Sequence, residues 1–190
     1  MKHPINSAAK PASPNNYAFI DGNNLYLGAK SQKVKLDYRK LRLYLKNKFH
    51  ISKAFLFIGY DKNNESLYDV FREYGYELIF KPVVFYTENG KRQMKGNVDA
   101  ELVLHAAAIE YRHYNQAVII SGDGDFACLL EFLQKKNKLA RIIAPAKRYS
   151  KLLRPFLPYI TQLNDIIDRL QLEPSRKITK KTGISGRSKP

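Results

Sequence analysis

Apolar runs and amphipathic stretches alternate along this chain between residues 17 and 172. Several runs are apolar at every position rather than at every second one, which is typical of strands buried on both faces of a sheet. The predicted strands are 17–21, 54–60, 76–85, 117–121, 140–144 and, last and shortest, 159–163. The stretches between them repeat apolar residues at helical spacing, and the predicted helices are 36–49, 65–75, 98–114, 125–137, 147–156 and 165–172.

This alternation predicts the fold class. Helices that link consecutive buried strands act as crossovers of βαβ units, and such units give a parallel sheet with helices on both faces. We therefore expect an α/β protein with a doubly wound, mostly parallel central sheet. The stretch 87–97 (TENGKRQMKGN) is predicted to be the longest basic, glycine-containing loop of the domain.

The two ends of the chain differ in composition from this central part. Residues 1–16 are rich in Pro, Ala, Ser and Asn, and residues 173–190 are polar and basic with almost no large apolar side chain. Such segments bury too little apolar surface to offset the entropy lost on ordering. We expect a flexible leader at 1–16, one domain at 17–172 and a basic disordered tail at 173–190.

The chain is strongly basic, with 33 Lys and Arg against 17 Asp and Glu and a net charge of +16. The two ends account for only part of this excess, because residues 17–172 still hold 25 basic and 16 acidic side chains. A basic surface favours polyanionic partners, first nucleic acid and second an acidic membrane surface. The tail is expected to add salt-sensitive affinity without sequence preference.

Cysteine content and hydropathy exclude several other classes. The single cysteine, Cys128, rules out an intrachain disulfide and any zinc cluster built on cysteines. It stands within the predicted helix 125–137, where we expect a small buried thiol. No apolar run reaches the ~18–20 residues of a membrane span, and no signal-peptide core follows Met1. We expect a cytoplasmic protein without a membrane partner, and the sequence leaves a homodimer open.

Acidic residues stand at the ends of apolar runs in this otherwise basic chain. Asp21 ends the run YAFI, and Asp123 and Asp125 follow the run AVII. Asp99 stands at the start of the predicted helix 98–114. In an open α/β sheet, ligands bind at the carboxyl ends of the strands, near the point where the strand order reverses. If the two strands are neighbours, the Cα atoms of Asp21 and Asp123 lie only ~5 Å apart.

Carboxylates that close repel one another, and a divalent cation offsets the repulsion. The set predicts a site for Mg²⁺ or Mn²⁺, because both ions prefer carboxylate, amide and water oxygens. Asn24 can add an amide oxygen. Each acid alone also has a simpler explanation, as a helix cap, an Asx-turn or a first-turn acid favoured by the helix dipole. Glu101 is about 200° around the helix from Asp99, so only one of these two is expected to face the site.

Other acidic and catalytic motifs do not fit. An EF-hand loop that begins at Asp123 would need Gly at position 128 and Glu at position 134, where this chain has Cys128 and Gln134. The phosphatase pattern needs a second acid two residues after Asp21, and Asn23 stands there. The chain has no Walker A sequence and no nucleophile elbow.

Three segments closely resemble the motifs of the NYN-domain family of PIN-like nucleases. They are YAFIDGNNL (17–25), KGNVD (95–99) and IISGDGDF (119–126), in the family's order and at its spacing. The resemblance implies a PIN-like three-layer α/β/α sandwich and Mg²⁺- or Mn²⁺-dependent hydrolysis of phosphodiester bonds in RNA. Carried onto this chain, it assigns the metal-site acids to Asp21, Asp99, Asp123 and Asp125, and a supporting polar role to Asn24.

The expected chemistry follows from such a site. As a hypothesis, bound metal activates a water and offsets the charge that grows on the scissile phosphate. Asp21 and Asp123 are expected to bind it directly, and Asp99 and Asp125 directly or through water, with one of these two accepting the proton of the attacking water. The products carry 5′-phosphate and 3′-hydroxyl ends. No 2′-hydroxyl is needed, so DNA stays open as a substrate beside RNA.

One position departs from the family pattern. Many relatives place a further aspartate about six residues beyond the helix-start acid, where this chain has His105, for which we expect a structural or exposed role. The departure supports an alternative, a catalytically weak or inactive PIN-like module that binds RNA or a protein partner. A topoisomerase-primase-type domain is a second alternative. It prefers glutamate at its first strand, and Asp21 speaks against it.

Basic and aromatic residues flank the predicted site. Tyr26, just past Asn24, is a tyrosine that we expect to stack on a base. The residues expected to hold the phosphate backbone precede the helix 98–114 or follow the strand 140–144: Lys91, Arg92, Lys95, Lys147, Arg148 and Lys151.

Overall fold

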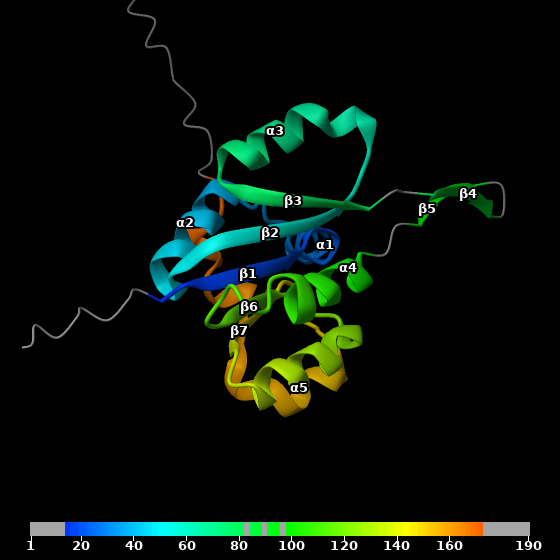
Figure 1. Cartoon of the computed structure of the whole chain (residues 1–190). Coiled ribbons are helices and arrows are strands. Elements are labelled where there is room, and N and C mark those ends of the chain that lie inside the picture. Colours follow the sequence, from blue (N-terminus) through cyan, green and yellow to red (C-terminus); the bar gives the residue numbers. More distant parts are fainter. Residues whose placement is uncertain (1–13, 82–83, 89–90, 96–97, 173–190) are drawn as a thin grey trace, which may run out of the picture.

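A six-stranded sheet, parallel throughout, forms the centre of the computed structural model. The structure describes residues 14–81, 84–88, 91–95 and 98–172, except for the side chains of 84–88 and 91–95. The strand order of the sheet is β3-β2-β1-β6-β7-β8 (Figure 1). The strands are β1 (Asn16–Asp21), β2 (Ile51–Gly59), β3 (Tyr76–Lys81), β6 (Ala117–Ile120), β7 (Leu139–Ala144) and β8 (Ile160–Gln162). The order runs outward in both directions from the β1–β6 pair, so the winding reverses between these two strands.

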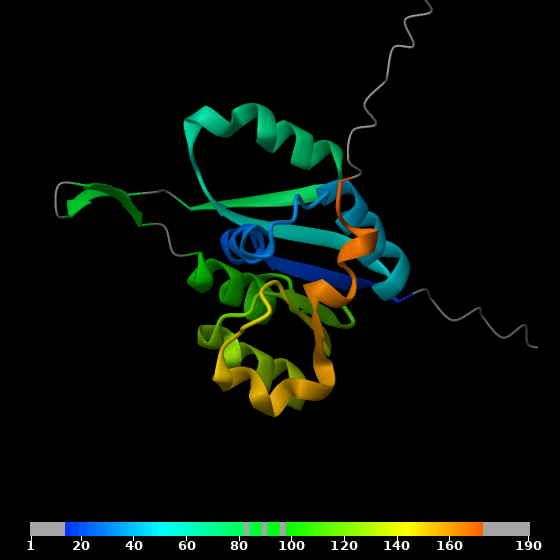
Figure 2. The same ribbon diagram turned by 180° about the vertical axis from the view of Figure 1, so that it is seen from behind.

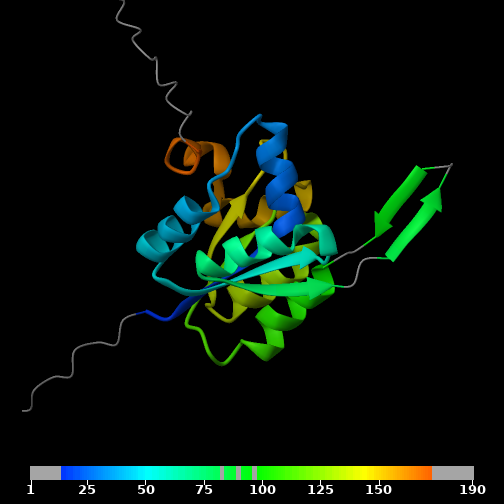
Figure 3. The same cartoon turned by 90° about the horizontal axis from the view of Figure 1, so that it is seen from above.

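Helices cover both faces of the sheet, which confirms the expected three-layer sandwich. The helices are α1 (Gly22–Ser31), α2 (Tyr38–Phe49), α3 (Glu65–Glu73), α4 (Asp99–Leu104) and α5 (Ala127–Lys135). Figures 2 and 3 show α1 and α2 on one side of the sheet and α4 on the other.

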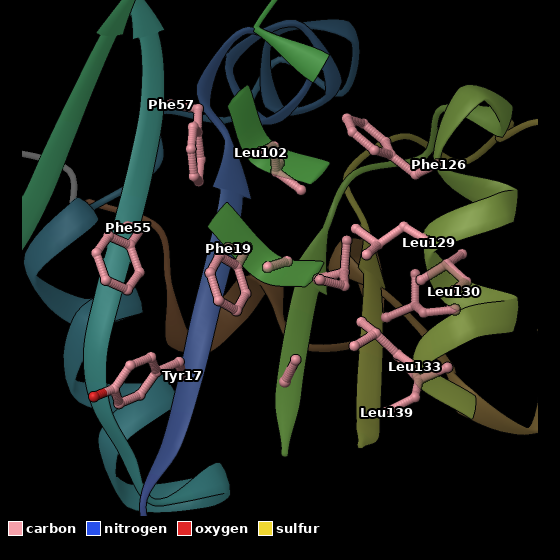
Figure 4. Packing of buried hydrophobic residues seen from close by; sticks show 14 of the residues in the cluster. Tyr17, Phe19, Phe55, Phe57, Leu102, Phe126, Leu129, Leu130, Leu133 and Leu139 are labelled. Atoms are coloured by element: carbon pink, nitrogen blue, oxygen red, sulfur yellow. The ribbon is translucent and has the colours of Figure 1, made fainter. Parts of the chain in front are cut away.

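Each face of the sheet has its own apolar core, because successive strand residues point to opposite faces. On one face, Phe19, Phe55 and Phe57 pack with Leu102 of α4 and Phe126 (Figure 4). On the other face, the alternate residues of the same strands pack against the first two helices and the last turns that the structure describes, with Ala18, Ile20, Leu56, Leu25, Leu41 and Leu170 among them. The predicted burial on both faces is therefore confirmed for the central strands β1 and β6, whereas the edge strands β3 and β8 are mostly only partly buried.

Helix α1 is a feature that the sequence pattern did not predict. It starts directly after β1, and the Oδ1 atom of Asp21 caps it by accepting the backbone N–H of Asn24 at 3.0 Å. Gly22 is its first residue, and a Cβ there would overlap the side chain of Ile58 and lie 2.8 Å from the carbonyl oxygen of Phe57. Glycine thus lets the helix begin against β2.

The predicted strand 76–85 and the predicted loop 87–97 are both wrong in extent. Strand β3 ends at Lys81, just before Pro82, a residue that has no N–H to donate to a ladder. The chain then forms an antiparallel pair, β4 (Val84–Glu88) with β5 (Lys91–Lys95), as a separate two-stranded sheet. This hairpin leads from β3 to α4 and stands away from the main sheet in Figures 1 and 3.

Several predicted helices are shorter or more tightly wound than expected. The pattern 98–114 becomes α4 followed by a π-helical turn, η2 (His105–Ile109), closed by the backbone N–H of Glu110 on the carbonyl of His105 at 2.9 Å. The pattern 147–156 becomes a 3₁₀ helix, η4 (Lys151–Tyr159), because Pro155 and Pro158 remove two backbone donors. The pattern 165–172 overlaps two single 3₁₀ turns, η5 (Leu163–Asp165) and η6 (Ile167–Arg169).

Three further expectations concern single features. Cys128 is exposed rather than buried, because Leu129 and Leu130 are the residues of that turn of α5 that enter the core. Within the described part of the chain, no helix combines the length and the apolar character needed to cross a bilayer. The expected leader lies outside the described residues up to position 13, and the expected tail lies wholly outside them. Strand β1 begins at Asn16, one residue before the predicted start of the domain.

Candidate metal centre

The site begins where the strand order reverses, at the neighbouring carboxyl ends of β1 and β6. These strands pair from Tyr17 with Ala117 to Ile20 with Ile120, so Asp21 and Ser121 follow at the same level. Asp21 is only 5% exposed and Ser121 only 2%. The hydroxyl of Ser121 donates to Oδ2 of Asp21 at 3.3 Å, while Oδ1 of Asp21 caps α1. Both oxygens of this buried carboxylate therefore have donors within the protein.

The turn after β6 is held by its own polar groups. The backbone N–H of Asp123 donates to Oγ of Ser121 at 3.1 Å, and Oδ1 of Asp123 accepts the backbone N–H of Asp125 at 3.1 Å. Asp123 thereby caps the 3₁₀ turn η3 (Gly124–Phe126). From α1, Oδ1 of Asn24 accepts the backbone N–H of Gly122 at 2.9 Å, which ties the turn to the first helix. The helix-cap explanation is thus confirmed for Asp123, and its role as a metal ligand stays a prediction.

Three acids come together at this edge from two separate elements. Asp99 lies in the first turn of α4, and Asp123 and Asp125 lie in the turn after β6. One carboxylate oxygen from each of the three lies within 4.8 Å of the others. The oxygens that bind one octahedral Mg²⁺ lie ~3–4 Å from one another, because each Mg–O bond is about 2.1 Å. Small side-chain adjustments would therefore let all three reach one ion.

The charges of these acids act on Asp21. Burial raises the pKa of Asp21, and the nearby carboxylates of Asp99 and Asp123 raise that pKa further. The hydrogen bonds from Asn24 and Ser121 oppose the rise. Asp21 stands outside the group of three, although it is close enough to feel two of its charges. A cation at the group would offset the repulsion that all four acids share.

Glu101 forms an ion pair outside the acidic cluster. Its Oε2 lies 3.0 Å from Nζ of Lys81, at the end of β3, in a half-buried ion pair. As expected, only one of Glu101 and Asp99 joins the cluster, and that residue is Asp99. No sequence signal marked Lys81, because the predicted strand 76–85 placed it in the strand interior, whereas β3 ends there.

His105, where the family pattern has an acid, packs within the protein. Its ring centroid is 5.9 Å from that of Phe55 and 5.4 Å from that of Phe57. Its Nδ1 atom is buried and has no hydrogen-bond partner within the structure. The structural role that we expected for this histidine is therefore the one that its packing supports.

The basic residues of the prediction fall into two groups. Lys91, Arg92 and Lys95 belong to β5, and their side chains lie outside the described residues. Lys147 and Arg148, in the segment after β7, are exposed and line a cavity of about 630 Å³ together with Lys33. Among the further predicted contacts, Lys151 is exposed at the start of η4, and Tyr26 is exposed on α1 beside Lys30, whose Nζ is 5.5 Å from the ring centroid.

Sequence reasoning missed polar residues at this edge and on helix α1. Ser121 was visible only as a serine between a strand and the acids, and its role as a link between Asp21 and the Asp123 backbone needs the β1–β6 pairing. Lys30 and Lys33 were missed because α1 was not predicted. A cap signal was present, since an aspartate followed by asparagines favours the start of a helix.

Fold and site together define an α/β domain that gathers acids where its parallel sheet reverses. The family model described as NYN domain matches residues 17–161, and the chain belongs to this family of PIN-like nuclease domains. The chain is similar to the Low amplitude and bright protein LabA of Synechococcus elongatus (strain ATCC 33912 / PCC 7942 / FACHB-805), with 28% identity over 155 residues, 78% of this chain and 83% of that protein.

A solved structure shares the fold. It is the crystal structure of a protein of unknown function from Vibrio parahaemolyticus RIMD 2210633, with a TM-score of 0.68 and 19% identity, covering 87% of this chain and 100% of that one. At this level of identity, the likeness concerns the fold alone.

Proposed function

We propose that this protein is a metal-dependent nuclease that hydrolyses phosphodiester bonds, with RNA as its favoured substrate. The observation that carries the proposal is the approach of Asp99, Asp123 and Asp125 to within 4.8 Å at the carboxyl edge of the sheet, beside buried Asp21. Membership of the NYN family supports the same reading. The net charge of +16 supports a polyanionic substrate.

The donor set fits a hard divalent cation, Mg²⁺ or Mn²⁺. It consists of carboxylate oxygens, which these ions prefer over nitrogen or sulfur. Asp99, Asp123 and Asp125 would hold the ion, with Asp21 next to them. When bound, such an ion lowers the pKa of a coordinated water and offsets charge on a phosphate.

The protein's own residues perform the remaining tasks. Asp21 is buried and fixed by two hydrogen bonds, so its carboxylate contributes negative potential at the carboxyl edge of the sheet. Asn24 and Ser121 keep the turn 122–125 in place, since each accepts a backbone N–H from it. Asp125, exposed at the mouth of the site, can accept the proton of an attacking water, as can partly exposed Asp99.

One observation favours a second candidate, a binding module that does not cleave. The imidazole of His105 packs against Phe55 and Phe57 where the family pattern has an acid, so the site has one carboxylate fewer. Loss of one ligand would weaken the hold on a cation and leave the basic surface intact.

Cleavage assays separate the two candidates. Purified protein is incubated with a 5′-labelled single-stranded RNA and a DNA of the same sequence, in Mn²⁺, in Mg²⁺ and in EDTA, with the Asp123→Asn variant in parallel. The asparagine can still accept the N–H of Asp125, so the turn should keep its cap. Cleavage that needs metal and disappears in the variant supports the nuclease. Binding without cleavage under every metal condition supports the binding module.

A further inference from the structure

A mixed aromatic and amide pocket opens beside the acidic edge, between α1 and α3. It has a volume of about 270 Å³. Gly22 and Asn23, which directly follow Asp21, form one end of it, and Asn64 lies across from them at the start of α3. One end of the pocket is therefore formed by the two residues that follow Asp21 in the chain.

The floor of this pocket is fixed by packing. The rings of Tyr38 and Phe71 lie 4.7 Å apart between centroids, and Phe71 and Tyr68 are buried. The hydroxyl of Tyr68 accepts the backbone N–H of Asp61 at 2.8 Å, which locks that ring in place. A preformed floor of this kind lowers the entropy lost when a ligand binds.

The rim of the pocket is exposed and chemically mixed. Tyr26 is 53% exposed and presents a ring at the opening, while Asn23 and Asn64 present exposed amides. An amide both donates and accepts hydrogen bonds, which is what the edge of a nucleobase requires, and an aromatic ring offers a face for stacking. The small volume suits one planar ring system rather than a peptide segment.

A second cavity lies behind the same two tyrosines. It measures about 440 Å³, and Tyr26 and Tyr38 line it as they line the first. Lys30, Lys33 and Lys35 supply its charge. The two rings thus stand between an amide-bearing pocket and a cluster of three ammonium groups.

We propose that these two cavities together bind one unstacked nucleotide of a single-stranded nucleic acid. Its base enters the pocket between α1 and α3, and a neighbouring phosphate meets the three lysines. The inference rests on the proposed nuclease function and deepens it. It places base recognition beside Gly22 and Asn23, the two residues that follow Asp21 in the chain.

The test uses binding, so that it does not depend on cleavage. The full chain carrying Asp123→Asn is titrated in EDTA with a single-stranded RNA that contains one 2-aminopurine, and fluorescence quenching reports stacking. Tyr26→Ala is compared with Leu27→Ala, the adjacent residue on α1, which is 51% exposed and does not line either cavity. Tyr26→Ala should weaken binding roughly 5- to 100-fold and remove the quenching, whereas Leu27→Ala should leave both unchanged.

Two further variants exclude a merely structural effect. Tyr26→Phe keeps the aromatic face and should restore binding and quenching. A double-stranded RNA of the same sequence should bind Tyr26→Ala and the parent protein equally well, because its bases stay stacked. Lys33→Gln combined with Lys35→Gln should weaken binding and flatten its dependence on salt.

The outcomes of these experiments test the nucleotide pocket independently of the proposed nuclease activity. Equal binding by Tyr26→Ala and Leu27→Ala, or no binding of the single strand by the parent protein, would overturn the nucleotide pocket even if the wild-type protein cleaves RNA. Weaker binding by Tyr26→Ala alone supports the pocket even if the wild-type protein cleaves nothing.

Discussion

The hydroxyl of Ser121 donates a 3.3 Å hydrogen bond to the carboxylate of Asp21, across the pair of strands at which the sheet reverses. The same hydroxyl oxygen accepts the backbone N–H of Asp123 at 3.1 Å. One buried side chain therefore links the acid that ends β1 to the turn that carries two of the clustered acids. The link makes the position of that turn dependent on the β1–β6 pairing.

Replacing Ser121 with alanine should lower both stability and activity. The change leaves the Asp123 N–H and one Asp21 oxygen without their partner, and an unsatisfied buried group costs about 1–3 kcal/mol. We expect the free energy of unfolding to fall by that amount and metal-dependent cleavage to slow. Urea denaturation and cleavage rates measure the two effects. The exposed Ser66→Ala on α3 serves as the control, and equal behaviour of the two variants would contradict the proposed role.

A double-mutant cycle tests whether the link is direct. If Ser121 acts through Asp21, the loss of stability caused by Ser121→Ala should be smaller in an Asp21→Asn background than in the wild type. Additive effects of the two substitutions on the free energy of unfolding would show that the residues do not interact energetically.

Asp99 and Glu101 should respond in opposite ways to neutralisation. Asp99→Asn removes an acid of the cluster and should abolish metal-dependent cleavage. Glu101→Gln breaks only the half-buried ion pair with Lys81, so cleavage should persist, with a loss of stability of about 1 kcal/mol or less. Cleavage assays at several Mn²⁺ concentrations distinguish the two variants. Loss of activity in Glu101→Gln at saturating metal would contradict the assignment.

Neutralising Asp21 should stabilise the metal-free protein. Burial, followed by the charges of Asp99 and Asp123, raises the pKa of Asp21 above its ordinary value of 3.8. Between that value and the raised pKa, the folded state binds more protons than the unfolded state, so the free energy of unfolding falls as pH rises through this window. The ionised carboxylate then remains a destabilising group at neutral pH.

Urea denaturation in EDTA across this pH range tests whether the ionised Asp21 carboxylate lowers the free energy of unfolding. Asp21→Asn should be more stable than the wild type at pH 7, and the difference should shrink as pH falls through the raised pKa of Asp21. The asparagine can still accept the Asn24 N–H, so the cap of α1 is retained. Exposed Asp168→Asn is the control. If Asp21→Asn were less stable than the wild type at neutral pH, the hydrogen bonds of the Asp21 carboxylate would stabilise the fold by more than its buried charge destabilises it.

Divalent metal should stabilise the folded protein through the same acids. A ligand that binds only the folded state adds about 2.7 kcal/mol when its free concentration is 100 times Kd. We expect the midpoint of thermal unfolding to rise with Mn²⁺ in the wild type and to stay constant in Asp123→Asn. Differential scanning calorimetry measures both. An equal rise in the two proteins would place the bound ion elsewhere.

The sequence by itself determined the sheet and the origin of the site. Runs such as AFLF in β2 and AVII in β6 are apolar at every position, and only strands covered on both faces bury such runs fully. The acids that follow β1 and β6 were recognisable because strand ends are visible as breaks in these runs. The apolar runs and the acids that end them are both local signals, since each is carried by residues that are adjacent in the sequence.

Only the tertiary structure decided which polar atoms meet. The approach of Asp99 to Asp123 and Asp125 depends on how α4 packs beside η3, and the pairing of Glu101 with Lys81 depends on the end of β3. Helix α1 also escaped prediction, because Gly22 and the two asparagines after it have low intrinsic helix propensity and the helix is held by a buried cap and by packing on β2. Contacts between residues distant in the chain carry no periodic signal, so their geometry emerges only when the whole sheet and its helices are assembled.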